Sequence, residues 1–173
     1  MNFKFVVVLA LLLFVTTGCG YKPTSHYAKN EINGNVYVIL KVDINNATNS
    51  VLAKDAVNEM VVNEFGASLT NEKANADTIV NVTLGSVSYT TLQSDNRGFS
   101  KLYRTTVSIS LIYKDVKTNV QKHLSVSDSY DYAVDEDSTI SEAKKLESVK
   151  IASTKALNKI FSKIAVQSFR KTK

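Results

Sequence analysis

Cys19, the only cysteine of the chain, has the most specific chemistry that the sequence offers. It follows an apolar run from Phe5 to Val15, and one charged residue, Lys4, precedes that run. The run is shorter than the roughly 20 residues of a transmembrane helix, but its length and basic flank are typical of a signal peptide. An exported protein with one unpaired thiol is unusual, whereas acylation of Cys19 would convert that thiol into a membrane anchor.

The residues directly before the cysteine, Val15 to Gly18, are small or uncharged and resemble the lipobox of bacterial lipoproteins, with Thr16 in place of the usual leucine. The resemblance implies that residues 1–18 are cleaved off. Cys19 then carries a diacylglycerol on its sulfur and an acyl chain such as palmitate on its amine, and several chains anchor a protein stably. Gly20, where an aspartate would retain the protein in the inner membrane, implies sorting to the outer membrane. The alternative is an ordinary secretory signal with an incidental cysteine.

Basic side chains form two candidate binding clusters. Grouped lysines and arginines can bind phosphates through charge-assisted hydrogen bonds, although solvated loop charges give the same pattern. The first cluster surrounds an expected turn and comprises Arg97, Lys101 and Arg104, with Lys122 expected nearby across the hairpin. The second lies on an expected C-terminal helix and comprises Lys155, Lys159 and Lys163. A basic helix stripe can meet anionic headgroups, but a lysine-rich solvent face is the favoured interpretation.

Patterns for catalysis or metal binding are weak. Ser141 to Lys144 matches the S-x-x-K spacing, but the companion motifs of penicillin-binding enzymes are absent and the segment fits a helix start better. The two histidines, His26 and His123, do not readily build a metal-binding pair or a serine triad. The acidic run at 135–137 lacks the glycine and the distal glutamate of a calcium loop. We therefore expect no catalytic activity, no cofactor and no metal site.

Composition limits the partners and the size of the domain. The chain has 21 basic and 16 acidic residues and a formal net charge of +5, which suggests an acidic partner or an anionic membrane surface. Nucleic acid is not expected as a partner of an exported protein. Cleavage leaves about 155 residues, which suits one domain that folds without a disulfide. We expect a polar tether over residues 19–34 and a single domain over residues 35–173.

The spacing of apolar residues predicts the first elements of that domain. Residues 36–44 alternate between apolar and polar types with a period of two, which predicts a strand with one buried face. Apolar residues then recur at three- and four-residue steps, which predicts a helix from Asn49 or Ser50 to about Thr70.

Three strand patterns and a second helix follow. The strands are expected over residues 80–89, 103–113 and 124–132, with turns near 95–98 and 117–119. The first pattern slips after Gly85, which indicates a β-bulge, and the last two strands should form a hairpin. Thr139 and Glu142 have the spacing of a capping box at the start of the closing helix.

The order of elements, β-α-β-β-β-α, favours the α/β (α+β) class as a two-layer sandwich, with two helices on one face of a mixed four-stranded sheet. The helices would then leave the opposite face open. That face is expected to carry small polar side chains and few charges, from Arg104, Thr106, Ser108, Ser110, His123, Ser125, Ser127 and Ser129. Such a face can contact a partner or simply be solvated, as in many antiparallel sheets.

The segment Cys19-Gly20-Tyr21-Lys22-Pro23, together with the order of elements, resembles the LptE family of lipopolysaccharide-assembly lipoproteins. The resemblance covers most of the chain after cleavage. It implies a non-catalytic outer-membrane protein that plugs and helps assemble the LptD β-barrel, binds lipopolysaccharide and supports its delivery to the cell surface. The first basic cluster would then contact the lipopolysaccharide phosphates. The alternative is an auxiliary lipoprotein of an envelope transporter or a structural envelope lipoprotein.

Overall fold

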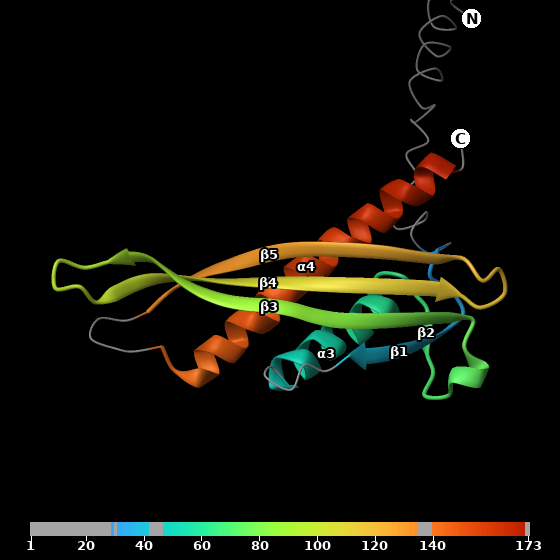
Figure 1. Cartoon of the computed structure of the whole chain (residues 1–173), viewed down its shortest axis with the longest axis horizontal. Coiled ribbons are helices and arrows are strands. Elements are labelled where there is room, and N and C mark those ends of the chain that lie inside the picture. The colour runs from blue at the N-terminus through green and yellow to red at the C-terminus, as the bar shows by residue number, and fades with distance from the viewer. Residues whose placement is uncertain (1–28, 30, 42–46, 135–139, 172–173) are drawn as a thin grey trace, which may run out of the picture.

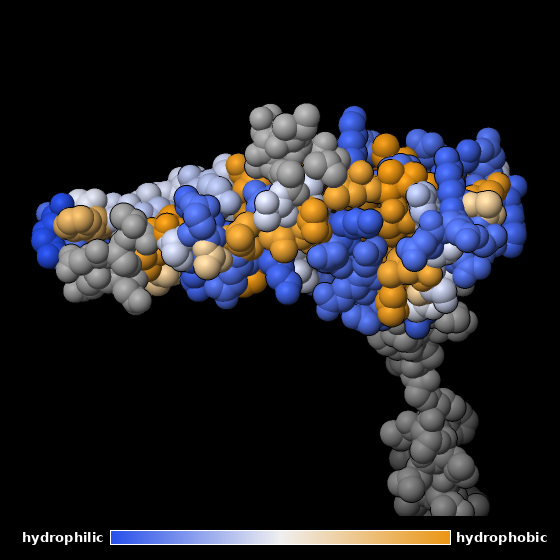
Figure 2. Space-filling model, turned by 90° about the horizontal axis from the view of Figure 1, so that it is seen from below, coloured by the Kyte–Doolittle hydropathy of each residue, from blue (hydrophilic) through white to orange (hydrophobic). Residues whose placement is uncertain are grey.

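The computed structural model describes residues 29, 31–41, 47–134 and 140–171. The two long helices pack against one face of an elongated sheet (Figure 1), so the predicted two-layer α+β architecture is confirmed. One end of the sheet projects beyond the helices as a narrow arm (Figures 1 and 2). The elements are β1 (Asn35–Lys41), α3 (Ala47–Asn63), β2 (Ser68–Leu69), a 3₁₀ turn η2 (Lys73–Asn75), β3 (Thr78–Ser94), β4 (Ser100–Asp115), β5 (Gln121–Ala133) and α4 (Glu142–Lys171).

The sheet has five strands in the order β2-β1-β3-β4-β5, so the expected count of four is wrong by one short strand. Strands β3, β4 and β5 form an antiparallel meander, whereas β1 runs parallel to both β2 and β3. The additional strand, β2, has two residues and pairs with Asn35 and Val36 at the outer edge of β1. The helix between β1 and β3 provides the crossover that a parallel pair requires.

Helix α3 ends at Asn63, earlier than the expected end near Thr70. The chain leaves the helix through Gly66, which has a φ of +64° in the left-handed region that glycine adopts readily. The N–H of Ala67 then donates to the carbonyl of Val61 at 3.1 Å. Leu69, which continues the helical spacing in the sequence, lies in β2 and is exposed. The spacing of apolar residues therefore predicted too long a helix, because that spacing does not change at this turn.

The core lies between the inner face of the sheet and the two helices. Alternate residues of β4, from Thr105 to Tyr113, are buried, as the period of two predicted. The rings of Phe65 and Phe161 meet edge to face, with centroids 5.2 Å apart, and connect α3 with α4. Burial of such apolar stripes supplies most of the drive for this packing.

Strand β3 contains the bulge that the sequence indicated. Its register with β4 shifts between Leu84 and Val87, so one extra residue on β3 restores the inward direction of the apolar side chains after Gly85. The two predicted turns are also confirmed, because β3 ends at Ser94 and β4 ends at Asp115. Beyond the bulge, β3 and β4 continue into the projecting arm.

The second helix begins at Glu142 and extends for 30 residues, about 45 Å, diagonally behind the sheet (Figure 1). The hydroxyl of Ser141 accepts a hydrogen bond from the N–H of Lys144 at 3.2 Å and so caps the first turn. The S-x-x-K segment is thus a helix start, as expected. Thr139, the predicted cap, lies outside the described residues.

Residues at the end of the predicted tether pack against the domain. Ile32 is fully buried in the core, and Gly34, with a φ of +68°, turns the chain into β1. The N–H of Asn35 donates to Asp77 Oδ2 at 3.0 Å, and Lys117 Nζ lies 3.0 Å from Asp77 Oδ1. The hydrogen bond from Asn35, followed by Lys117, lowers the pKa of Asp77 from its ordinary value. This tie is therefore present at neutral pH and is lost as the pH falls through the lowered pKa.

Replacing Gly34 with alanine should destabilise the protein more than the same change at Gly98. Both glycines have a positive φ. A Cβ at Gly34 would collide with the Asp77 carboxyl group, 2.8 Å from its Cγ, whereas a Cβ at Gly98 would meet no atom within 4 Å. We expect Gly98→Ala to lower the free energy of unfolding by about 1 kcal/mol and Gly34→Ala by about 2–3 kcal/mol. Urea unfolding of both variants measures this, and equal losses would contradict the role of Asp77.

Candidate functional site

On β4 and β5, the open face of the sheet carries small polar side chains from Arg104 to Ser110, as expected, whereas Ile112 and Lys114 follow on the same face of β4. In the register of β4 with β5, Ser108 lies opposite Ser127 and Ser110 lies opposite Ser125. These four hydroxyl groups form two adjacent rows across the face that the helices leave uncovered. The Ser110 hydroxyl is also 2.8 Å from His123 Nε2, which places this histidine in a surface hydrogen bond. Such a face offers many hydrogen-bond donors and acceptors with little charge.

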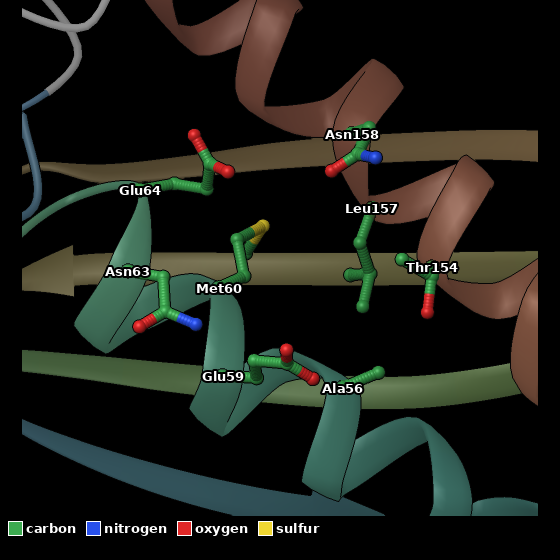
Figure 3. Close-up of a pocket in the computed structure, with 8 residues that line it drawn as sticks. All are labelled: Ala56, Glu59, Met60, Asn63, Glu64, Thr154, Leu157 and Asn158. Atoms are coloured by element: carbon green, nitrogen blue, oxygen red, sulfur yellow. The ribbon is translucent and has the colours of Figure 1, made fainter.

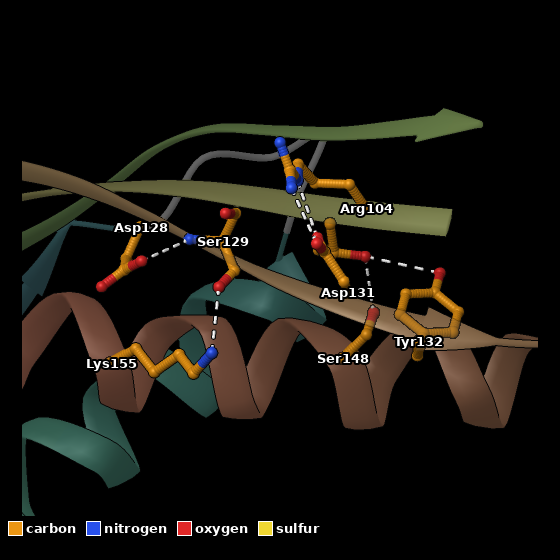
Figure 4. A network of polar contacts seen from close by, with 8 residues as sticks. Arg104, Asp128, Ser129, Asp131, Tyr132, Ser148 and Lys155 are labelled. Carbon is orange, nitrogen blue, oxygen red and sulfur yellow. Dashed lines mark hydrogen bonds and ion pairs between the residues drawn. The ribbon is translucent and has the colours of Figure 1, made fainter. Parts of the chain in front are cut away.

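Arg104 is the member of the first basic cluster that lies on this open face. Its Nε and Nη2 atoms each lie 2.7 Å from an oxygen of Asp131, directly opposite on β5 (Figure 4). The hydrogen bonds lower the pKa of Asp131 and raise the pKa of Arg104. Both side chains are about two-fifths exposed, at 44% and 40%, so the pair adds little stability. It does cancel the net charge of this part of the face.

Arg97 and Lys101 lie at the hairpin end, defined here as residues 92–102, and are held there by Asp95. Asp95 Oδ1 accepts hydrogen bonds from the N–H groups of Arg97 and Phe99, both at 2.9 Å. Its Oδ2 lies 3.5 Å from Arg97 Nη2 and 3.8 Å from Lys101 Nζ. Burial raises the pKa of Asp95, but these N–H groups and Lys101 outweigh it and hold the pKa below its ordinary value. One carboxylate therefore both shapes the turn and places two cations.

The hairpin end also exposes apolar surface next to these cations. Phe99 is 49% exposed and Leu92 is 40% exposed. The guanidinium of Arg97 lies 5.5 Å from the centre of the Phe99 ring, within the range of a cation–π contact. Cations beside exposed apolar side chains suit an amphiphile that carries phosphates and acyl chains.

Lys122 does not join this cluster, so the expectation that it lies nearby is wrong. The register places Lys122 opposite Tyr113, nine residues along β4 from Arg104, which corresponds to about 30 Å. It lies on the helix-covered side of the sheet and forms an ion pair with Glu31. Burial, together with Glu31, raises the pKa of Tyr113 at the same place. Lys122 thus holds Glu31, which lies near the end of the predicted tether, against the sheet.

The lysine stripe of α4 covers the outer edge of β5, the last strand of the sheet. Lys155 Nζ donates to the carbonyl of Ser129 at 3.3 Å (Figure 4), and Lys163 Nζ donates to the carbonyl of Ser125 at 3.4 Å. Between them, Lys159 Nζ lies 3.0 Å from Asp128 Oδ2. Lysines on an edge strand hinder its pairing with another chain. The stripe therefore does more than face solvent, which was the favoured expectation.

A buried polar contact, which sequence reasoning missed, connects α4 with β4. The hydroxyl groups of Thr105 and Ser148 are 2.7 Å apart, and both residues are fully buried. Ser148 Oγ also donates to the carbonyl of Lys145 at 2.7 Å, and the Tyr132 hydroxyl lies 3.4 Å from Thr105 Oγ1 (Figure 4). Because each hydroxyl has a partner, the contact avoids the cost of an unpaired buried polar group. It is structural and faces away from the open face.

A shallow groove separates α3 from α4 (Figure 3). Met60 and Leu157 form its floor, with Glu59 and Asn158 among the residues on its sides. Its volume is about 140 Å³, below the roughly 300–1,000 Å³ of ordinary small-molecule pockets. This groove is too small to hold the acyl chains of a lipid.

The remaining expectations concern the signal segment, membrane spans and metal sites, and the described residues bear on only some of them. Cys19 and the signal segment lie outside them. Within residues 29, 31–41, 47–134 and 140–171, no helix is long and apolar enough to cross a membrane. The same part of the chain contains no group of three or more histidine, cysteine, aspartate or glutamate side chains arranged to hold a metal ion.

Removing the lysines that cover β5 should promote self-association. We expect the double variant Lys155→Ala, Lys163→Ala to aggregate several-fold faster on incubation, because it frees the carbonyls of Ser125 and Ser129 on the edge strand β5. The matched control, Lys73→Ala with Lys150→Ala, removes the same charge from exposed positions elsewhere. Light scattering over time measures the rate. If both double variants aggregate at the same rate, net charge and not edge protection is responsible.

Comparison with solved structures finds a similar fold in proteins that are described as lipoproteins. A protein described as a lipoprotein from Caulobacter crescentus CB15 superposes with a TM-score of 0.53 at 9% identity, over 84% of this chain and 95% of that one. Rare lipoprotein B from Shewanella oneidensis gives a TM-score of 0.46 at 12% identity, over 80% of this chain and 95% of that one. At such identities the first of these establishes a common fold and nothing more.

Sequence comparison identifies the family. No curated protein matches the sequence significantly. The family model of LptE, described as lipopolysaccharide assembly, matches residues 37–171, which extends from β1 to the end of α4. The chain therefore belongs to the LptE family of lipopolysaccharide-assembly lipoproteins.

Proposed function

We propose that the protein is anchored in the outer membrane through acylated Cys19, after removal of residues 1–18. Residues 19–34 form the tether, whose last residues pack against the domain. From there it enters the lumen of an LptD-like β-barrel as a plug and helps to deliver lipopolysaccharide to the cell surface. The observation that carries the proposal is the part of the open sheet face on β4 and β5 from Arg104 to Ser110, which is rich in hydroxyl groups and whose only charged side chains, Arg104 and Asp131, are paired with each other. Membership of the LptE family supports this assignment.

The physical argument concerns the cost of removing the open face from water. A partner that covers lysine or glutamate must compensate a large desolvation penalty, whereas a serine or threonine hydroxyl needs one or two hydrogen bonds. The rows of Ser108 with Ser127 and Ser110 with Ser125 meet this condition. Arg104 and Asp131 already satisfy each other. The wall of a water-filled barrel, rich in polar side chains, is a suitable partner for such a face.

Lipopolysaccharide phosphates are proposed to bind at the hairpin end and the adjoining part of the open face. Arg97, Lys101 and Arg104 supply the positive charge, and exposed Phe99 supplies apolar contact. The ion pairs of Arg97 and Arg104 involve exposed guanidinium groups and are therefore weak, and a phosphate forms charge-assisted, bidentate hydrogen bonds with arginine. Lys101, whose Nζ is buried beside Asp95, adds positive charge behind them. A phosphate can therefore replace Asp95 or Asp131. Lys122 is not part of this group, because it lies about 30 Å from Arg104.

The proposed role is non-catalytic. The family acts in assembly and not as an enzyme. The hydroxyl of Ser141, the serine of the S-x-x-K spacing, accepts the N–H of Lys144 at the helix start. His123 bonds to the Ser110 hydroxyl on the surface. We assign no cofactor and no metal to the protein.

Negative charge on the open face should break the complex with the barrel. We expect the double variant Ser108→Glu, Ser125→Glu to recover at least about tenfold less β-barrel than the wild type when the lipoprotein is purified from detergent-solubilised membranes, because buried carboxylates would lack partners. Ser162→Glu, on the exposed side of α4, is the control and should retain the barrel. Thermal unfolding checks that each variant is folded. Equal recovery from all three proteins would contradict the assignment of the face.

Loss of charge at the hairpin end should weaken lipopolysaccharide binding. We expect Arg97→Ala with Lys101→Ala to raise the dissociation constant at least about tenfold, since two positive charges and the charge-assisted hydrogen bonds of Arg97 are lost. The affinity should also depend less on salt than that of the wild type. Lys150→Ala, an exposed lysine of α4, serves as the control. Titration of fluorescent lipopolysaccharide at two salt concentrations measures both effects, and unchanged binding by the double variant would remove the hairpin end from the site.

A further inference from the structure

In the half of the sheet that leads to the hairpin end, the two edges are protected very differently. On one side, lysines of α4 occupy carbonyls of β5 at Ser125 and Ser129. On the other side, β1 pairs with β3 only as far as Thr83. From Leu84 to Ser94, no strand among the described residues pairs with β3 on the side away from β4. An edge strand presents unpaired N–H and C=O groups, and those groups can pair with another extended chain.

The chemistry of this part of β3 favours pairing. Residues 84–94 contain no charged side chain and no proline, the two residue classes that usually discourage strand addition. Between the bulge and the next irregularity, residues 87–91 keep an unbroken register with β4, from Val87 opposite Val107 to Thr91 opposite Tyr103. Figure 2 views the molecule from this side, where pale, weakly polar surface runs along the upper border of the arm and blue surface covers its tip. Five regular residues, about 17 Å, equal a typical strand.

The side chains around these backbone groups define what can bind. Ser88 and Thr90 are exposed and belong to the open face, whereas Val87 and Tyr89 turn toward the helices. The ammonium group of Lys145 lies 5.9 Å from the centre of the Tyr89 ring. An added strand would continue this pattern, with small polar residues on one side and apolar ones on the other. Residues 87–91 themselves carry no charged side chain, and Lys145 stands on the helix side of this segment, at the Tyr89 ring.

We infer that residues 87–91 of β3 pair with an extended, uncharged segment of the β-barrel partner, which adds a sixth strand to the sheet. This inference rests on the proposed plug function. A second copy of the chain is the weaker occupant, because a five-residue strand pair provides only a small part of the roughly 1,200–2,000 Å² that a stable complex buries. The barrel supplies the remainder through the open face. Main-chain hydrogen bonds then fix the orientation of the plug, as in other cases of strand addition.

The test compares one substitution at the two edges of the same row. Ser88 on β3, Thr106 on β4 and Ser129 on β5 lie opposite one another across the sheet. Ser88→Lys and Ser129→Lys therefore place the same charge on the same face, but only the first is on the free edge. In full-length lipidated protein purified from detergent-solubilised membranes, both variants carry the cost of a charge on the open face, and Ser88→Lys should recover at least about fivefold less barrel than Ser129→Lys, because only Ser88→Lys also blocks the free edge.

Equal recovery with both variants and the wild type would overturn the strand addition. An equal loss in both variants would overturn it too, because charge on the face, and not blockage of the edge, would then be responsible. If the wild type recovers no barrel, the proposed function itself fails. A photo-crosslinking amino acid at Ser88 provides a second measurement should the lysine variant not fold. A crosslink to one short barrel segment is expected. A crosslink to a second copy, or none while the barrel is present, would overturn the inference.

Discussion

Strands β4 and β5 pair residue for residue over thirteen positions without a register shift, and this pairing decides what the helices cover and what they leave open. Because side chains alternate between the faces of a strand, one register places Ile109 and Val126 toward the helices and Ser108 and Ser127 toward the open face. A slip by one residue would reverse both faces at once. The polar face, the Arg104–Asp131 pair and the core therefore share one origin.

The helices complete this division and produce the asymmetry of the molecule. Helix α4 crosses behind β4 and β5, and its lysines reach the outer edge of β5, so that edge is covered at Ser125 and Ser129. Helix α3 is shorter and lies behind β1 and the first part of β3. Beyond β1, the sheet continues as β3, β4 and β5, and the β3–β4 hairpin extends past β5 with Asp95 at its tip. The open face, the hairpin end and the free edge of β3 consequently lie on one continuous region that the helices do not cover.

Much of this arrangement could be predicted from the sequence because it depends on local patterns. The period of two identified the long strands, the slip after Gly85 identified the bulge, and the polar positions of β4 and β5 identified the open face. The end of α3 could not be predicted, since Phe65 and Ala67 remain buried beyond it and Gly66 alone marks the turn. The pairing of α4 lysines with β5 carbonyls depends on how the helix crosses the sheet, which no local pattern encodes. Lys122 is different, because the turn at 117–119 already fixes the hairpin register and so places this lysine opposite Tyr113.

The central claim is that the open, hydroxyl-rich sheet face is covered by a barrel. The most direct measurement is affinity purification of the wild-type lipidated protein from detergent-solubilised membranes, with mass spectrometric identification and quantification of the proteins that accompany it. We expect one large outer-membrane β-barrel in a ratio near one to one. Recovery of an inner-membrane transporter, or of no partner, would contradict the claim and would favour an auxiliary or structural envelope lipoprotein.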